Sequence, residues 1–286
     1  AFVAVIGAGP IGGALAQKLA LRDRVGEVRL VDPDPGIAQG KALDILQSSP
    51  IEAFSARLVA AQSIHSAAGA SAVVIADAGA TGTEYAEESG FALLKQLAAF
   101  EGSAPLVFAG ADQRGLIARA VDELHVARVR LIGTAPAALE SALRALTALA
   151  MDSSGAEVHL RLVGTPPDGV VVGWEEATAS GLPLRTQLAP HLIGALNARI
   201  PNLWPPGPLA LASAAARGVE AIVNGSRRQF TCYVSLDSGP ARNAVAAMPT
   251  QLGAGGVLRV LEPVLSRLER TQMDTAIERF SVRGTR

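Results

Sequence analysis

The sequence predicts an α/β protein in which a doubly wound parallel sheet is followed by an α+β domain. Through the first half of the 286 residues, short apolar runs alternate with helical stretches, an order typical of a parallel sheet covered by helices. A glycine-rich turn joins the first run to the first helical stretch, as in sheets of the Rossmann type. The alternation stops near residue 150. We therefore expect a Rossmann domain over residues 1–134 and a second, α+β domain over residues 135–286.

The first half contains six expected strands, because its short runs are rich in β-branched and apolar residues. They are residues 2–6, 28–31, 57–60, 72–76, 106–109 and 129–132. Helices are expected between most of them, over residues 11–21, 37–47, 85–100 and 113–124. Pro136 can occupy the first turn of a further helix that runs to about residue 150, since the first turn needs no hydrogen-bonded N–H.

The second half follows a different pattern. Residues 157–163 and 170–172 are expected to form an antiparallel ribbon. A helix is expected over residues 187–199, and the proline-rich residues 201–208 predict a rigid connection. The remaining expected elements are a helix over residues 209–223, a strand over residues 230–236 and a closing helix over residues 255–280.

Composition excludes several classes of function. Hydrophobic residues make up 49% of the chain and charged residues 18%, so we expect a large core and apolar surface covered by a second copy, most simply in a homodimer. The net charge of −1 gives no electrostatic basis for binding nucleic acid or an anionic membrane. No apolar stretch approaches the roughly 18 residues of a membrane span, and no signal peptide is recognised. Cys232, the single cysteine, is expected in the core and fits a reducing cytoplasm.

A dinucleotide-binding fingerprint surrounds the first expected strand. Gly7, Gly9 and Gly12 have the required spacing, and Asp32 closes the second strand twenty residues after Gly12. These glycines would permit a tight turn, the approach of a pyrophosphate and close helix–strand packing, while the helix N-terminus offers N–H groups to the anion. Asp32 would accept hydrogen bonds from the adenosine ribose and repel a phosphorylated ribose, so the sequence predicts NAD as the small-molecule cofactor. The expected cofactor-binding residues are Gly7, Gly9, Pro10, Ile11, Gly12, Asp32, Ala78 and Gly79.

From the second strand onward, the sequence resembles the malate/lactate dehydrogenase family, in particular its bacterial malate dehydrogenase pattern. The resemblance covers nearly the whole chain and rests on residues 32–45, 48–50, 180–184, 219–222, 234–237, 248–253 and 256–257. It implies that the Rossmann domain of residues 1–134 binds NAD and that residues 135–286 form a substrate-type or dimerisation α+β domain. In that family the reaction is reversible hydride transfer between NAD and a 2-hydroxy acid.

The residue that would accept the proton in such a reaction is replaced. Oxidising a hydroxyl group requires a base with a pKa near neutrality, and histidine is the usual one. Where the resemblance implies a histidine in a glycine-rich turn, this chain has Pro166, whose ring neither donates nor accepts a side-chain proton. Asp168 remains from that turn, but an ordinary aspartate has a pKa of about 4 and is a poor base.

Two further parts of the implied site are altered. The helix that would supply an orienting carboxylate and a substrate arginine has Glu140 and Arg144. Because these residues are four apart, we expect an ion pair along one helix face rather than a displaced substrate clamp. The lid that would follow Gly79 is shortened, and no arginine lies between Arg57 and Arg114. Both lid cations implied by the resemblance are therefore missing.

Two functions are compatible with this sequence. The first is an NAD-binding protein that is non-catalytic or regulatory and does not oxidise 2-hydroxy acids by the family's mechanism. The second is an NAD-dependent oxidoreductase acting on an altered CH–OH substrate, with Asp168, Glu140, His159 or Tyr85 in new roles. The sequence favours the first, because the base, the substrate arginine and the lid arginines are lost together. His65 and His125 are expected at the surface and His191 at the start of a later helix, and no residue spacing predicts a metal site.

Overall fold

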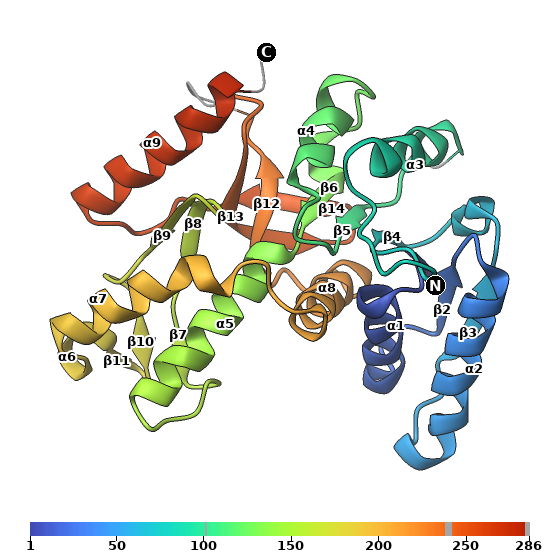
Figure 1. Ribbon diagram of the computed structural model, residues 1–286, viewed down its shortest axis with the longest axis horizontal. Coiled ribbons are helices and arrows are strands. Elements are labelled where there is room, and N and C mark those ends of the chain that lie inside the picture. Colours follow the sequence, from blue (N-terminus) through green and yellow to red (C-terminus); the bar gives the residue numbers. More distant parts are fainter. Residues whose placement is uncertain (101, 238–241, 284–286) are drawn as a thin grey trace.

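The first half of the chain forms a parallel sheet whose strands follow the order β3-β2-β1-β4-β5-β6 (Figure 1). The structure is a computed structural model that describes residues 1–100, 102–237 and 242–283. In this order the chain winds outward from β1 in both directions, which creates a switch point between β1 and β4. The doubly wound sheet predicted from the sequence is therefore confirmed. Its strands are β1 (Phe2–Ile6), β2 (Glu27–Val31), β3 (Arg57–Ala61), β4 (Ala72–Ile75), β5 (Leu106–Phe108) and β6 (Leu131–Gly133).

The helices of this half begin where proline or a capping side chain favours a first turn. Proline occupies the first turn of α1, α2 and α5, and the Asp34 carboxylate caps α2 by accepting hydrogen bonds from the backbone of Gly36 and Ile37. The α1 and α2 helices are followed by Asp23 and Ala53 in the left-handed conformation. The helices are α1 (Pro10–Arg22), α2 (Pro35–Glu52), α3 (Glu87–Phe100), α4 (Arg114–Asp122) and α5 (Ala135–Ala150).

The second half continues the same sheet. Tyr233 of β12 pairs with Gly133 of β6 in an antiparallel arrangement, and the sheet then extends through β13, β8 and β9. Its strands are β12 (Gln229–Ser235), β13 (Val245–Gly253), β8 (Leu162–Thr165), β9 (Gly169–Val172) and β14 (Gly256–Val260). A small sheet contains β7 (Val158–His159), β10 (Thr178–Ala179) and β11 (Leu182–Pro183). The helices are α6 (Leu184–Gln187), α7 (Pro190–Arg199), α8 (Pro208–Val223) and α9 (Arg267–Arg283), with 3-10 turns at Ile64–Ala67, Arg128–Arg130 and Ile200–Leu203.

The prediction of a single closing helix over residues 255–280 is wrong in its first part. Gly256 has a φ of +106° and turns the chain from β13 into β14, and α9 begins only at Arg267. The β13 strand was not expected either. It contains Pro249, a residue that argues against a strand because it has no N–H to donate. The hairpin forms because β13 is held on both sides, by β12 and by β14.

Two other predicted elements are divided. The strand expected over residues 157–163 is two strands, because β7 pairs with β10 in the small sheet while β8 pairs with β9 and β13 in the large one. The helix expected over residues 187–199 is interrupted before Pro190, which starts α7 as its first residue. Proline at that position cannot continue the ladder of the preceding helix, α6.

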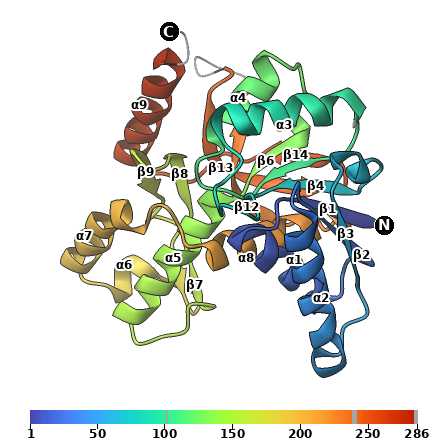
Figure 2. The ribbon, with the colours of Figure 1, turned by 45° about the vertical axis from the view of Figure 1, so that its right-hand side comes forward.

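The two halves also meet through helices. The α8 helix lies beside α1 (Figures 1 and 2), and Arg22 of α1 forms an ion pair with Glu220 of α8 at 3.1 Å. Because this contact and the continuous sheet join the two halves, the domain boundary between residues 134 and 135 stays a prediction. Among the described residues, no helix is both long and apolar enough to cross a membrane.

Candidate nucleotide-binding site

The glycine turn after β1 has the close contacts that its sequence predicts. Gly7 has a φ of +103°, and a Cβ on it would lie 2.2 Å from the Asp77 carbonyl oxygen. A Cβ on Gly12 would lie 1.9 Å from the carbonyl oxygen of Gly7. Both positions therefore require glycine, one for the turn and the other for the packing of α1 against it.

The backbone N–H groups of this turn all have partners within the chain. The Asp77 carboxylate accepts hydrogen bonds from the N–H groups of Ile11 and Gly12, each at 2.8 Å. Pro10 has no N–H, so these are the first two donors of α1. The other bonds are Gly7 to Val31 oxygen, Ala8 to Asp32 Oδ2, Gly9 to Asp77 oxygen and Gly13 to Gly9 oxygen, at 2.7 to 3.0 Å. The place where α1 would bind an anion is thus taken by a side chain.

Asp77, which no sequence pattern singled out, is the central group of this site. It lies directly beyond β4 and is 1% exposed. Burial raises the pKa of Asp77, whereas the hydrogen bonds from Ile11 and Gly12 and the charge of Lys41 lower it. The sequence feature that could have indicated Asp77 is its position as an acidic residue just after a buried parallel strand, at the edge where such sheets bind ligands.

Asp32, which the sequence predicts to bind the adenosine ribose, holds the surrounding loops together. Its Oδ2 accepts hydrogen bonds from Ala8 and Gly79 at 2.8 Å, and its Oδ1 accepts one from Asp34 at 2.9 Å. A carboxylate offers about four acceptor positions, so one remains for a ribose hydroxyl. Asp32 is 2% exposed and lies at the wall of a pocket of about 510 Å³. The pocket is lined by Asp32, Pro33, Asp34, Pro35, Ala78, Ala80 and Tyr85.

A second carboxylate binds backbone beyond β5. Glu84 accepts hydrogen bonds from Ala111 and Asp112, both at 2.9 Å, and burial raises the pKa of Glu84. Gln113, which was likewise not expected from the sequence, is 1% exposed and accepts a hydrogen bond from Gly110 at 2.8 Å. Glu84 and Gln113 therefore satisfy the N–H groups of the loop that follows β5.

The turn expected to carry a base has no ionisable group at its centre. Pro166 is buried, and its carbonyl oxygen accepts a hydrogen bond from the Tyr233 hydroxyl at 2.9 Å. Burial raises the pKa of Tyr233, so this hydroxyl keeps its proton at neutral pH. Asp168 is exposed and lines a cavity of about 1040 Å³ bordered by residues of β9, α7 and α9.

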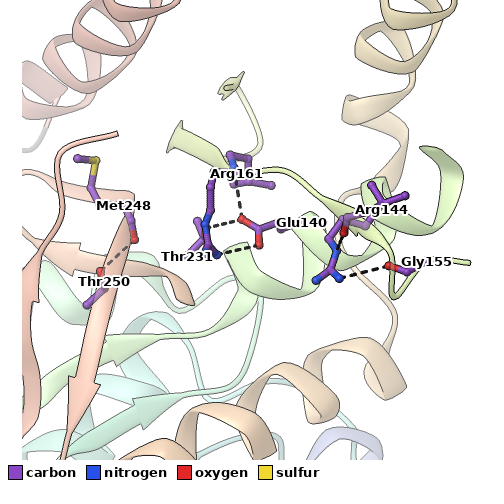
Figure 3. Close-up of polar contacts among 9 residues, drawn as sticks. Glu140, Arg144, Gly155, Arg161, Thr231, Met248 and Thr250 are labelled. Atoms are coloured by element: carbon purple, nitrogen blue, oxygen red, sulfur yellow. Dashed lines mark hydrogen bonds and ion pairs between the residues drawn. The ribbon is translucent and has the colours of Figure 1, made fainter. Parts of the chain in front are cut away.

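Glu140 and Arg144 are not paired as the sequence predicted (Figure 3). Glu140 is 6% exposed; it accepts hydrogen bonds from Thr231 and Leu162 and forms an ion pair with Arg161 at 3.4 Å. Arg144 instead donates to the carbonyl oxygens of Val158 and Gly155, at 2.6 and 3.2 Å. The prediction failed because β8 and β12 bring closer partners to Glu140 than the next helical turn does. Burial raises the pKa of Glu140, an effect that the charge of Arg161 opposes.

The candidate catalytic residues lie in separate places. Glu140, Arg144 and His159 line a pocket of about 420 Å³ that shares no residue with the Asp168 cavity or the Asp32 pocket. All four histidines are exposed, as is consistent with surface positions. Cys232 is fully buried in β12, which confirms it as a core residue. No group of three or more potential metal ligands occurs among the described residues.

Comparisons with known proteins agree with this architecture. Residues 1–84 match the family model described as lactate/malate dehydrogenase, NAD binding domain. The chain is 26% identical to the malate dehydrogenase of Chloroherpeton thalassium, over 96% of this chain and 94% of that protein. The malate dehydrogenase structure from Salinibacter ruber has a TM-score of 0.88 at 24% identity, covering 99% and 96% of the two chains. The Cryptosporidium parvum lactate dehydrogenase structure, complexed with lactic acid and β-nicotinamide adenine dinucleotide, has a TM-score of 0.85 at 20% identity, covering 98% and 96%.

The sheet order, the glycine turn and Asp32 define a protein with a dinucleotide-binding fold. Within that class, residues 1–84 match the NAD-binding domain of the lactate/malate dehydrogenase family, and nearly the whole chain is similar to malate dehydrogenases.

Proposed function

We propose that this protein binds NAD but does not oxidise 2-hydroxy acids by the mechanism of its family, and that its role is non-catalytic or regulatory. NAD binding is supported by the family model that residues 1–84 match and by the pocket beside Asp32, which lies where the adenosine half of a dinucleotide would be expected. The diphosphate does not fit this conformation of the turn, because the first N–H groups of α1 are bonded to Asp77. The adenosine half is therefore the part of NAD for which the site is prepared.

The loss of the family's reaction is supported most directly by Pro166. This residue stands where a proton acceptor would be needed, and its carbonyl oxygen is bonded to Tyr233. A proline side chain cannot take part in proton transfer. Asp168 lines a different cavity from Glu140 and His159, so no single pocket among the described residues brings these three candidates together.

The alternative function is an oxidoreductase with a new CH–OH substrate. Of its four candidate residues, Tyr85 is the one that lines the pocket beside Asp32. Burial raises the pKa of Tyr85, and the charges of Asp32 and Asp77 raise it further. A phenol that holds its proton more tightly than usual is a weaker general base at neutral pH. The pocket therefore favours binding without the family's chemistry.

NADH is expected to bind at least about tenfold more tightly than NADPH, because a 2′-phosphate would face the Asp32 carboxylate. Isothermal titration calorimetry on the purified protein measures both constants. Asp32→Ala should weaken NADH binding and reduce the ratio between the dissociation constants of NADPH and NADH. Because the substitution also removes the acceptor for three N–H groups, its folding is checked by circular dichroism. Undetectable NADH binding to the wild-type protein would refute the function, whatever the variant does.

We further propose that the protein assembles as a homodimer. The α2 helix exposes Leu43 and Ile51, at 55% and 86%, and apolar side chains of this size favour burial against a partner. Sedimentation velocity at micromolar concentration should give twice the mass of the 29.3 kDa chain. Leu43→Glu should shift the protein toward the monomer, whereas Leu149→Glu, at an exposed leucine on α5, should not. A monomeric wild-type protein would exclude this assembly.

A further inference from the structure

We use the term nucleotide groove for the sheet edge beyond β1, β4 and β5, where a dinucleotide would lie. We propose that the connection from Asp77 to Glu84 occupies this groove, with the Asp77 carboxylate in the place of a diphosphate on α1. In the same way, the Glu84 carboxylate accepts hydrogen bonds from the backbone N–H groups of Ala111 and Asp112 beyond β5. This inference deepens the proposed nucleotide binding and rests on it. Its consequence is that NAD gains little from its diphosphate unless this connection is displaced or neutralised.

The Asp77 carboxylate meets the N-terminus of α1 as a bound oxyanion would. Each of its oxygens accepts one N–H, Oδ2 from Ile11 and Oδ1 from Gly12, at 2.8 Å. These are the groups that a helix N-terminus offers to a phosphate. A Cβ on Gly9 would lie 2.5 Å from Asp77 Cγ, so the close approach that this glycine allows is already used by a side chain. A diphosphate in the same place would have no N–H left to bind.

Glu84 makes the same kind of contact on the other side of β4. Its two oxygens accept the N–H groups of Ala111 and Asp112, and a Cβ on Gly110 would lie 2.2 Å from its Oε2. Because a dinucleotide lies across the switch point of such a sheet, the edge beyond β5 belongs to its second nucleotide. Asp77 and Glu84 thus lie in the two halves of the groove.

The connection between the two carboxylates is itself held in place. Asp77 and Glu84 form an antiparallel bridge, and Ala78 donates to Thr83 oxygen at 2.9 Å. Tyr85 donates to Ala76 oxygen at 3.0 Å, which fixes the end of the connection against β4. The two acids are therefore carried into the groove together by a short closed loop.

The charges around Asp77 oppose a bound diphosphate. Asp77 interacts electrostatically with Glu84 and Tyr85 of the same connection and with Lys41 of α2, and Tyr85 also interacts with Asp32 at the end of β2. Lys41 is the cation among these groups. A diphosphate next to Asp77 would raise the pKa of this carboxyl above its value in the free protein, which burial has already raised. NADH binding should therefore take up a proton. The affinity for NADH should rise as the pH falls from the pKa of Asp77 in the complex to its lower pKa in the free protein, by at most about tenfold per pH unit.

The test compares three ligands on the full chain by calorimetry at pH 7: adenosine, adenosine diphosphate and NADH. For the wild-type protein we expect the three dissociation constants to agree within about threefold, because the phosphates add no net attraction. Asp77→Asn should tighten adenosine diphosphate and NADH by at least about tenfold, which corresponds to about 1.4 kcal/mol, and leave adenosine unchanged. Glu84→Gln should tighten NADH alone, since adenosine diphosphate does not reach beyond β5.

Asp274→Asn is the matched control, because it removes one charge from the exposed face of α9. It should change none of the three constants. Asp77→Ser provides a second neutral side chain that accepts hydrogen bonds, and thermal unfolding checks that each variant folds. Titrations of NADH in buffers of different ionisation enthalpy should show proton uptake by the wild-type protein, and less by Asp77→Asn.

Two results would overturn the inference in distinguishable ways. If the wild-type protein binds adenosine diphosphate at least tenfold more tightly than adenosine, and neither Asp77 variant changes this, Asp77 does not occupy the diphosphate position although nucleotide binding stands. If none of the three ligands binds the wild-type protein, the nucleotide-binding function fails together with the inference.

Discussion

Neither malate nor lactate is expected to be oxidised by this protein with NAD, because the turn that would supply the base has Pro166 and Glu140 is bonded to Arg161 and Thr231. A positioned general base contributes about 10²- to 10⁴-fold to such a rate. Orientation by a substrate arginine contributes further, and the arginine nearest to the implied position, Arg144, is bonded to the carbonyl oxygens of Val158 and Gly155. We expect turnover to lie at least about 10⁴-fold below that of an active relative.

The turnover of malate and lactate is measured from the absorbance of the NADH that forms. The malate dehydrogenase of Chloroherpeton thalassium serves as the positive control. Pro166→His tests the reasoning further. A histidine alone should not restore turnover, because Glu140 is held by Arg161 and Thr231 and does not orient it. Turnover of either acid by the wild-type protein at ordinary dehydrogenase rates would show that another residue supplies the proton acceptor.

Gly12→Ala is expected to destabilise the protein by roughly 3 kcal/mol or more, or to prevent its folding. A Cβ at this position would lie 1.9 Å from the Gly7 carbonyl oxygen. The atoms that this Cβ would meet most closely belong to the Gly7 backbone, and a Cβ has a fixed position on its own backbone, so no side-chain rotation relieves the contact. The glycine turn, α1 and the strand before it would have to separate, and with them the groove.

Gly40→Ala is the matched control for this substitution. Gly40 lies in α2, and a Cβ on it would meet nothing within 4 Å, so alanine should stabilise the helix by up to about 1 kcal/mol. Urea unfolding followed by circular dichroism measures both changes. Equal stability of Gly12→Ala and the wild-type protein would show that α1 does not pack on the turn at this distance.

Local sequence predicted the first half well, because its strands and helices each have strong local signals. The apolar runs at Phe2–Ile6 and Ala72–Ile75 lie in the parallel sheet, and proline marks the starts of α1, α2 and α5. The second half was predicted less well where tertiary pairing overrides a local signal. Pro249 disfavours a strand, yet β13 forms between two neighbours that supply the remaining hydrogen bonds.

The chemical character of the site was predictable only in part. Residue types showed that a base was missing at Pro166 and that Gly7 and Gly12 belonged to a tight turn. The pairing of Glu140 with Arg161 was not predictable, because 21 residues separate them and the register of β8 brings them together.

The residues alone established a doubly wound sheet, a glycine turn and an acid at the end of β2, since each follows from spacing within a short stretch of chain. Only the folded chain decided which N–H groups the acids bind. Asp77 is 65 residues from Gly12, and the two meet because β4 lies directly beside β1. Backbone N–H groups at that edge bind the nearest oxygen acceptor, and in this chain that acceptor is the Asp77 carboxylate.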